Sequence, residues 1–353
     1  MDFTDQATGI RAGETLDTAK LEAYLKDTIP DLQGTLNIQQ FPSGHSNLTY
    51  LLTVGDREMV LRRPPFGTKA KTAHDMGREY RILNVLKPVF PYVPMPLAYT
   101  EDPAVMGCPF YVMERIRGII LRKELPEGLE LPREKMRRLC EKLVEVQYQL
   151  HSLDYQKIGL ADFGKPDGYV QRQVSGWSQR YRNARTPDAP EFENVMTWLA
   201  EHMPPDSPFP GIIHNDFKFD NVILDPNDPL SVIGILDWEM ATVGDPLMDL
   251  GCTLGYWVEQ NDPPEFQLMR TLPTHVPGTL SRKEMLACYE KLSGRTISHA
   301  DFYLCFGMFR LAVIAQQIYY RYYHGQTKDA RFKKLIFAVQ LLEKAAAAFV
   351  KKQ

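Results

Sequence analysis

The pattern of apolar and polar positions changes its period once along the chain. Before Gly118, apolar residues fall in short runs or alternate with polar ones, which is typical of β-strands. A tight Gly55-Asp56 turn marks one hairpin among them. We predict strands at 36–41, 48–54, 58–63, 97–100 and 110–115, and helices at 17–29 and 71–86. This part of the chain is therefore expected to form a small, mainly antiparallel sheet domain.

After Gly118 the spacing of apolar residues becomes helical. The clearest case is 132–153, where Met136, Leu139, Leu143 and Leu150 share one face. Further helices are predicted at 169–182, 191–202, 246–259, 281–292, 301–324 and 330–350. The stretch 262–278 is rich in Pro and Gly, so we expect it to be the most mobile loop.

This change of period predicts an α+β protein with two lobes. We expect a sheet lobe over residues 1–113, a hinge at 114–118 and a helical lobe over 119–353. A length of 353 residues agrees with this division, because chains of that size rarely form one core.

Composition excludes several classes of protein. With 44% hydrophobic and 24% charged residues the chain is ordinary for a globular protein, and a net charge of −3 gives no electrostatic case for a nucleic-acid partner. The longest apolar run, 302–323, contains Arg310, Gln316 and Arg321. We therefore expect a buried or amphipathic helix there rather than a membrane span.

The cysteines and the N-terminal segment bear on the compartment. Five cysteines lie far apart without a CxxC pair, which argues against a disulfide framework and a cysteine zinc site. Residues 1–14 are polar and lack the basic start and apolar run of a signal peptide. These features favour a soluble, cytoplasmic protein without a membrane partner, and they leave the oligomeric state open.

Candidate chemistry concentrates in the segment 212–221 and the hairpin that follows it. Asn221 opens an apolar strand at 222–224, turn-forming residues occupy 225–229, and a return strand at 232–236 leads to Asp237. In an antiparallel hairpin the first residue of one strand lies near the last residue of the other. We therefore expect Asn221 and Asp237 to converge, and their oxygens are hard ligands suited to magnesium.

Two further residues of this segment suit phosphoryl transfer. Asp216 precedes Asn221 in the loop and could accept or orient the proton of a substrate hydroxyl, while Lys218 could offset charge on the transferring phosphoryl group. His214 is expected to be structural. Each residue alone could instead be a cap, a turn former or a solvated charge, so the combination carries the prediction.

This combination resembles the aminoglycoside phosphotransferase and choline kinase family, which shares its fold with protein kinases. The family pattern H-x-D-x-x-x-x-N, followed by a hairpin and an Asp, is matched by His214, Asp216, Asn221 and Asp237. Lys218 gives the D-x-K-x-x-N spacing of protein kinases. The resemblance covers nearly the whole chain and implies a two-lobed protein-kinase-like fold that uses ATP and Mg²⁺.

The segment 244–250 also resembles the family. Asp245 followed by Pro246 is a favourable helix start, so we expect Asp245 to be an N-cap. Asp249 is expected to brace the catalytic loop.

In the family, the loop between the first two strands covers the triphosphate. The corresponding loop here holds only one glycine, Gly44, but Ser43, Ser46, Asn47 and backbone N–H groups could donate to phosphate. A plain hairpin turn is the open alternative.

The resemblance also implies a cation at the end of the third strand, paired with a helix Glu. Here Arg62 occupies the place of the usual Lys, and Glu79 is the expected partner. An Arg is not interchangeable with a Lys, so this departure from the family pattern would change how the phosphates of the nucleotide are contacted. Glu114 and Ile116 lie in the segment that would contact adenine through backbone groups.

Within the family, the chain is most similar to phosphotransferases associated with acyl-CoA dehydrogenases. The segments 60–65, 309–312 and 316–322 carry this resemblance, which implies a hydroxyacyl acceptor, CoA-linked or free. Arg310 and Arg321 on the expected substrate helix would favour an anionic acceptor, unless they are solvated or paired with structural carboxylates.

The sequence therefore predicts an ATP- and Mg²⁺-dependent kinase that phosphorylates a hydroxyl of a small molecule. Alternatives are a nucleotide-binding pseudokinase with a regulatory role, suggested by Arg62 and the glycine-poor loop, and an aminoglycoside- or choline-type kinase. A metal-dependent hydrolase built on His214 and Asp216 is disfavoured, because no further histidine lies at ligand spacing.

Overall fold

The computed structural model describes residues 3–42, 47–67 and 75–351. Two compact units account for the chain: a sheet unit of Met1–Ile120 and Val222–Ala241, and a helical unit of Leu121–Asn221 and Thr242–Gln353. The α+β class, with a small antiparallel sheet and a mainly helical second part, is confirmed. The boundaries predicted at 113 and 118 stay predictions, and the hairpin 222–241 groups with the sheet.

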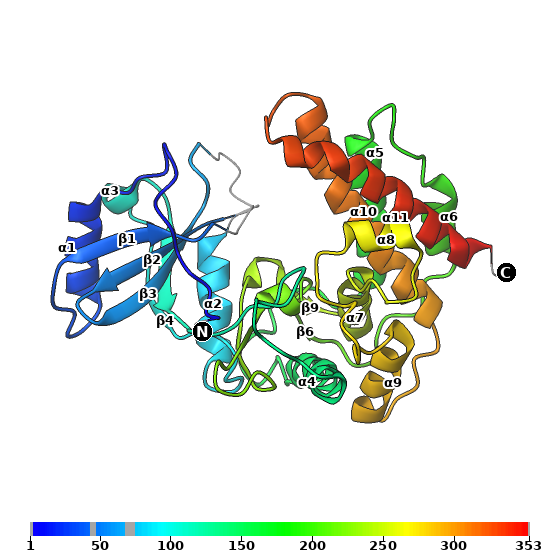
Figure 1. Ribbon diagram of the computed structural model, residues 1–353, viewed down its shortest axis with the longest axis horizontal. Helices are drawn as coiled ribbons and strands as arrows, with labels where there is room; N and C mark the ends of the chain where they lie inside the picture. The colour runs from blue at the N-terminus through cyan, green and yellow to red at the C-terminus, as the bar shows by residue number, and fades with distance from the viewer. Residues whose placement is uncertain (1–2, 43–46, 68–74, 352–353) are drawn as a thin grey trace. The chain divides into compact units, whose positions relative to one another are not determined.

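The sheet unit is built on five described strands in the order β1-β2-β3-β5-β4, all neighbours antiparallel. Figure 1 shows this sheet in blue to cyan with helices beside it. The strands are β1 (Leu36–Gln40), β2 (Leu48–Val54), β3 (Arg57–Arg63), β4 (Pro96–Thr100) and β5 (Phe110–Glu114). The helices are α1 (Thr18–Thr28), α2 (Met76–Leu86) and α3 (Pro103–Met106).

Helix α2 places one charged residue against the sheet. It begins after Asp75, whose side chain accepts a hydrogen bond from the Arg78 N–H at 2.9 Å. Glu79 lies on the same buried side as Ile82, Leu83 and Leu86, so the apolar face of the helix carries a carboxylate inward. The helix was predicted to start at 71, and residues 71–74 lie outside the described ones.

The predicted hairpin is confirmed. Strands β7 (Val222–Leu224) and β8 (Val232–Ile235) pair antiparallel, with Val222 opposite Ile235. Leu224 exchanges backbone hydrogen bonds of 2.8 and 2.9 Å with Ile119, and these bonds attach the hairpin to the rest of the sheet unit. A turn of 3₁₀ helix, Phe219–Asn221, leads into the hairpin instead of the strand extending to Asn221.

The helical unit is built around the long helix α10 (Ala300–Tyr323), which packs on α7, α11 and α5. The other helices are α4 (Arg133–His151), α5 (Tyr169–Ala184), α6 (Glu193–Glu201), α7 (Pro246–Gly255), α8 (Pro264–Met269), α9 (Arg282–Ser293) and α11 (Leu335–Val350). A two-stranded ladder of β6 (Gly211–Ile213) and β9 (Thr242–Gly244) completes the unit. Aromatic residues such as Tyr181, Phe306 and Phe309 fill its core.

Helix α10 is, among the described residues, the one helix long and apolar enough to cross a membrane by length and composition. Within that apolar window, 72% is buried inside the structure. The prediction of a buried helix for this run is therefore confirmed.

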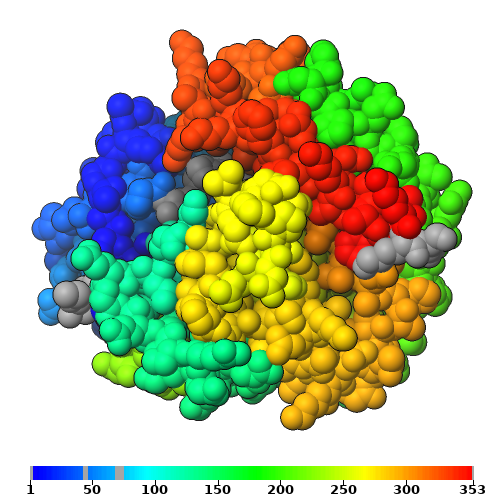
Figure 2. Space-filling view, turned by 45° about the vertical axis from the view of Figure 1, so that its right-hand side comes forward, coloured from blue at the N-terminus to red at the C-terminus, as the bar shows by residue number. Residues whose placement is uncertain are grey.

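In this unit the structure corrects one sequence expectation and adds one element that was not predicted. The stretch 262–278 was predicted as a loop, but it contains α8, because Pro264 at the first helical position suits a helix start. Figure 2 shows this yellow segment on the surface of the helical unit beside the red helix α11. The β6–β9 ladder was not predicted, since strands of three residues show no alternation.

Close packing of α7 on α10 depends on glycines. A Cβ on Gly307 would overlap the carbonyl oxygen of Gly251, and a Cβ on Gly255 would lie 2.6 Å from the carbonyl oxygen of Gly307. The two backbones therefore touch directly, and this contact sets the position of every side chain that α10 presents to α7.

Gly307→Ala is expected to lower the free energy of unfolding by about 1–3 kcal/mol, because the added methyl group forces the two backbones apart. Gly176→Ala is the matched control, since a Cβ there would meet only the Arg180 side chain at 3.5 Å. That helix-interior substitution should instead stabilise by about 0.5–1 kcal/mol. Urea unfolding measures both, and equal effects would contradict the packing argument.

Candidate functional site

The segment between β6 and the hairpin forms a short loop in the helical unit. Asn215 adopts a left-handed backbone with φ 65°, a conformation that Asn tolerates better than most residues. The Nδ1 of His214 accepts a hydrogen bond from the Asp216 N–H at 3.3 Å. This contact agrees with the structural role expected for His214, and the turn fixes the direction in which the Asp216 carboxylate points.

Asp249, on helix α7, fixes this loop through hydrogen bonds to its backbone. Its carboxylate, fully buried, accepts from the backbone N–H groups of His214 at 3.0 Å and Asn215 at 2.6 Å. It also accepts from the His151 Nε2 at 2.9 Å and the Gln147 Nε2 at 3.4 Å. The expectation that Asp249 braces this loop is therefore confirmed, and the catalytic role of the loop stays a prediction.

Electrostatics favour the ionised form of Asp249. Burial alone would raise the pKa of its carboxyl, but the hydrogen bonds from the His151 side chain and the His214 backbone N–H hold the pKa below its ordinary value. His151 in turn accepts at Nδ1 from the Tyr289 hydroxyl at 2.9 Å, which leaves its Nε2 proton directed at Asp249. Neither His151 nor Gln147 is predicted from the sequence as a site residue.

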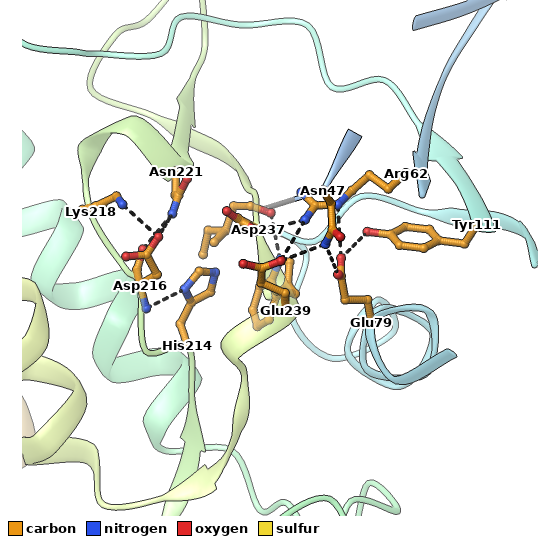
Figure 3. Close-up of polar contacts among 12 residues, drawn as sticks. Asn47, Arg62, Glu79, Tyr111, His214, Asp216, Lys218, Asn221, Asp237 and Glu239 are labelled. Atoms are coloured by element: carbon orange, nitrogen blue, oxygen red, sulfur yellow. Dashed lines mark hydrogen bonds and ion pairs between the residues drawn. The ribbon is translucent and has the colours of Figure 1, made fainter. Parts of the chain in front are cut away.

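The side chains of Lys218 and Asn221 converge on the carboxylate of Asp216. The Asp216 Oδ2 accepts from the Lys218 Nζ and from the Asn221 Nδ2, each at 2.8 Å. The Asn221 Nδ2 also donates to the Asp216 backbone carbonyl at 2.8 Å. Figure 3 shows the three side chains pointing toward one another. These bonds turn the amide nitrogen of Asn221 toward Asp216, so its amide oxygen is the atom that could bind a cation.

Lys218 is held in a half-enclosed position above an aromatic ring. Its Nζ lies 4.5 Å from the centroid of the Tyr256 ring, a cation–π contact. Burial would lower the pKa of this ammonium, but Tyr256, Asp216 and Asp220 around it raise the pKa above its ordinary value. The side chain therefore stays protonated. Tyr256, which is not predicted from the sequence as a site residue, lies at the C-terminal end of α7.

Asp220 adds a second carboxylate near Lys218, with an Oδ1 to Nζ distance of 3.7 Å. Burial raises the pKa of Asp220 to about 6, the charge of Lys218 opposes that rise, and the like charge of Asp216 reinforces it.

In the sheet unit, a separate group of polar side chains surrounds Arg62 and Glu79. The expected ion pair is present, with the Arg62 Nε 3.2 Å from the Glu79 Oε2. Glu79 also accepts from the Tyr111 hydroxyl at 2.7 Å and from the Asn47 Nδ2 at 3.1 Å. Figure 3 shows these donors arranged around Glu79. The pair is buried rather than exposed, with side chains 10% and 2% accessible.

Arg62 also donates from Nη2 to the Asp237 Oδ1 at 2.8 Å. Asp237 has a left-handed backbone with φ 66°, which is uncommon outside glycine and concentrates at functional sites. Asn47 donates to Glu239 at 2.8 Å. Asp237 and Asn47 are therefore both attached to the Arg62–Glu79 pair.

Arg62→Met is expected to destabilise the sheet unit in a pH-dependent way. Burial raises the pKa of Glu79 above its ordinary value of 4.5, and Arg62 is the main group that opposes this rise. Above its folded pKa, the ionised Glu79 carboxylate therefore lowers the free energy of unfolding. This cost disappears as pH falls below 4.5, because Glu79 is then protonated in both the folded and the unfolded protein. Without Arg62 the cost grows, to roughly 3 kcal/mol at neutral pH.

Urea unfolding at about pH 5 and about pH 7.5 measures this difference. The deficit of Arg62→Met should be smaller at the lower pH, where Glu79 can take up a proton. Arg57→Met, at the exposed start of the same strand, serves as control and should show little loss at either pH. A deficit of Arg62→Met that is the same at both pH values would refute the linkage.

The remaining predicted nucleotide contacts have different outcomes. Ser43, Gly44 and Ser46 lie outside the described residues. The Glu114 N–H donates to the Met95 carbonyl at 2.8 Å, and its carboxylate accepts from the Lys87 Nζ at 2.8 Å. Ile116 follows β5 and is half-buried. The roles of these residues in nucleotide binding stay predictions.

The chemistry of the donor set fits magnesium. The Asn221 amide oxygen and the Asp237 carboxylate are hard oxygen ligands. Among the described residues no group of three or more His, Cys, Asp or Glu side chains could hold a metal. A cation would therefore need substrate oxygens or water besides these two. Because Asn221 and Asp237 belong to different units, their sharing of one ion stays a prediction.

The chain matches a family model and several curated proteins. The model described as "Phosphotransferase enzyme family" matches residues 37–271. Acyl-CoA dehydrogenase family member 11 of Gallus gallus is 34% identical over 327 residues, covering 90% of this chain and 41% of that protein. Acyl-CoA dehydrogenase family member 10 of Mus musculus is 35% identical over 316 residues, covering 88% and 29%. The chain thus spans less than half the length of these relatives.

Solved structures share the fold. A Ralstonia eutropha JMP134 protein named after the aminoglycoside phosphotransferases has a TM-score of 0.80 at 32% identity, covering 96% of this chain and 99% of that one. An aminoglycoside phosphotransferase solved with ADP and hygromycin B has a TM-score of 0.57 at 14% identity, covering 94% and 97%. The kinase-like, two-lobed fold predicted from the sequence is confirmed.

Proposed function

The chain belongs to the phosphotransferase enzyme family, and from this premise we propose that it transfers the γ-phosphoryl group of ATP, with Mg²⁺, to a hydroxyl of a small molecule. As a small-molecule kinase it needs a group that orients the hydroxyl and cations that neutralise the phosphoryl group. The observation that carries the proposal is the convergence of Lys218 and Asn221 on the Asp216 carboxylate at 2.8 Å.

Asp216 supplies the acceptor for the hydroxyl proton. The hydroxyl would donate to its carboxylate and attack the γ-phosphorus in line with the leaving ADP oxygen. Lys218 lies beside that carboxylate and remains protonated, so its Nζ can move from Asp216 to the transferring phosphoryl oxygens as negative charge develops there. Asp249 fixes the loop that carries Asp216 and Lys218, because it accepts hydrogen bonds from the backbone N–H groups just before them.

Two residues are proposed to hold the magnesium ion and one to bind phosphate. The Asn221 amide oxygen and the Asp237 carboxylate suit the ion, which when bound neutralises the phosphates and orients them. Arg62 is fixed by Glu79 and offers its guanidinium to the phosphates. Aminoglycoside phosphotransferases of the same fold have been solved with ADP and with AMP-PNP, which supports nucleotide binding by this chain.

The acceptor is proposed to be a hydroxyacyl compound, CoA-linked or free. The relatives named as acyl-CoA dehydrogenase family members support this choice, because the matched segment is part of larger proteins named for acyl-CoA chemistry. An aminoglycoside acceptor is polycationic and would need an acidic wall, whereas α10 contributes the buried cation Arg310.

A nucleotide-binding pseudokinase is the second candidate. The observation that favours it is the Arg62 ion pair with Asp237 at 2.8 Å, which occupies a carboxylate that the kinase needs for its metal. A kinase would have to exchange this pair for the magnesium ion during each cycle.

An ATP-consumption screen distinguishes the two candidates. The purified protein is incubated with ATP and hydroxy acids, hydroxyacyl-CoAs, aminoglycosides, choline or sugars, with Mg²⁺ and with EDTA. The kinase proposal predicts acceptor-dependent ADP formation with a hydroxyacyl compound that EDTA abolishes. Nucleotide binding in a thermal-shift assay, without ADP formation for any acceptor, would instead establish the pseudokinase.

A further inference from the structure

A buried arginine of α10 lies in the helical unit without an ionic partner. Arg310 is 3% exposed. Among the described residues its side chain forms no ion pair, and its hydrogen-bonding neighbour is the uncharged thiol of Cys252 on α7. Burying a guanidinium costs several kcal/mol unless an anion compensates it. Arg321, the other cation of this helix singled out from the sequence, is exposed and needs no such compensation.

The protein supports Arg310 only in part. Its Cζ lies 5.0 Å from the centroid of the Trp177 ring on α5, and such a cation–π contact contributes about 0.5–2 kcal/mol, less than an anion would. Gly307 precedes Arg310 by one helical turn and lets α10 touch α7 backbone to backbone. This backbone contact fixes the position of α10 on α7, and it thereby holds the Arg310 guanidinium close to α7.

That place adjoins the catalytic loop of the same unit. The titratable groups around Arg310 include the Cys252 thiol, the Tyr256 hydroxyl and the Asp216 carboxylate, and of these three the carboxylate is the one that is charged at neutral pH. Tyr256 in turn carries the Lys218 Nζ 4.5 Å above its ring, and Lys218 bonds to Asp216. Tyr256 thus neighbours both cations, and Arg310 belongs to the same polar surroundings as the carboxylate that orients the acceptor hydroxyl.

We propose that Arg310 is the specificity-determining residue that binds the acyl oxygens of the acceptor, which is a hydroxy acid or its thioester. The hydroxyl of such an acceptor faces Asp216, and a carboxylate or carbonyl a few bonds away accepts hydrogen bonds from the planar guanidinium fork. This inference rests on the proposed function, and it names the acceptor group that would provide the counter-charge missing at Arg310.

Six-carbon acceptors separate the contribution of the acyl oxygen from that of the hydroxyl. The probes are hydroxyhexanoic acids with the hydroxyl at successive carbons, their CoA thioesters, and hexanediols, which keep a hydroxyl but lack the acyl group. The variants are Arg310→Met and Arg310→Lys, with exposed Arg321→Gln on the same helix as control. Circular dichroism and thermal unfolding establish that each variant is folded.

Arg310→Met is expected to lower kcat/KM for the preferred acid or thioester about 10- to 100-fold, mainly through KM, because one charge-assisted contact is lost. The same variant should leave kcat/KM for hexanediols within about twofold, Arg310→Lys should retain part of the preference, and Arg321→Gln should match the wild type. Preference for acid over thioester, or the reverse, identifies which acyl oxygen is bound. Equal losses for acids, thioesters and diols, or no loss, would overturn the proposal.

Calorimetric binding of the acids and thioesters without nucleotide separates this inference from the kinase activity. Binding that depends on Arg310 in a protein that transfers no phosphoryl group would uphold the inference and refute the proposed function. Phosphorylation of hexanediols at an undiminished rate, without Arg310-dependent binding of any acid or thioester, would do the reverse. A wild-type protein that neither binds nor phosphorylates any of these compounds would overturn the inference.

Discussion

Asp249→Asn is expected to destabilise the protein by about 3–5 kcal/mol and to reduce phosphoryl transfer in the fraction that remains folded. The carboxylate accepts from four donors, the N–H groups of His214 and Asn215 and the side chains of His151 and Gln147. An asparagine would turn an NH₂ group toward some of these donors. The replacement therefore leaves buried donors unpaired and releases the loop that positions Asp216.

The loss should have a defined pH dependence. Because the donors hold the pKa of Asp249 below its ordinary value of 3.8, its contribution to stability is complete above that value. It is lost only as pH falls through the lower folded pKa, so the gap between wild type and variant should stay constant from about pH 5 to about pH 8.

Asp245→Asn provides a matched control on the same helix. Asp245 is the N-cap of α7, and its Oδ1 accepts from the Leu247 N–H at 2.7 Å. Asparagine caps helices as well as aspartate does, so this variant should lose little stability. Urea unfolding and the ATP-consumption assay measure both variants. Similar losses for the two would contradict the bracing role of Asp249.

The parts of the site that could be predicted from the sequence are local. Asp216, Lys218 and Asn221 lie within six positions, so any loop conformation keeps them near one another, and the structure joins all three. The hairpin was predictable because turn residues separate two apolar runs. The pairing of Arg62 with Glu79 is not local, and it was expected only through the family resemblance.

The parts that could not be predicted depend on tertiary contacts. Gln147 and His151 are polar residues on a helix whose buried face is otherwise apolar, and only the fold shows that Asp249 is their partner. Tyr256 and Trp177 matter because their rings make cation–π contacts with Lys218 and Arg310, and only the fold shows these contacts. The left-handed backbones of Asn215 and Asp237 likewise have no signal in composition, although Asn and Asp tolerate that conformation.

Asp216→Asn is expected to reduce kcat by about 10²–10⁴-fold, the usual contribution of a positioned acid–base group. The amide cannot accept a proton from the acceptor hydroxyl, but its oxygen can still accept from Lys218 or Asn221. The loop should therefore keep its conformation, and the KM for ATP should change little. Steady-state kinetics with the best acceptor from the screen measure both parameters.

Asp220→Asn tests whether charge alone explains this effect. Asp220 lies on the same loop, 3.7 Å from the Lys218 Nζ, but the proposed reaction gives it no proton to accept. Its replacement removes an equal charge close by, so the loss in kcat should fall well below that of Asp216→Asn. Equal losses would show that the loop responds to net charge rather than to a proton acceptor at Asp216.

Phosphorus NMR of the reaction mixture tests the central claim most directly. Wild type, ATP, Mg²⁺ and the best hydroxyacyl acceptor should yield ADP together with a phosphate-ester signal in equal amount. Asp216→Asn should give neither signal at the same enzyme concentration and time, while binding ATP as the wild type does. An unchanged rate of ester formation by Asp216→Asn, or ADP appearing with inorganic phosphate and no ester, would contradict a hydroxyl kinase that acts through Asp216.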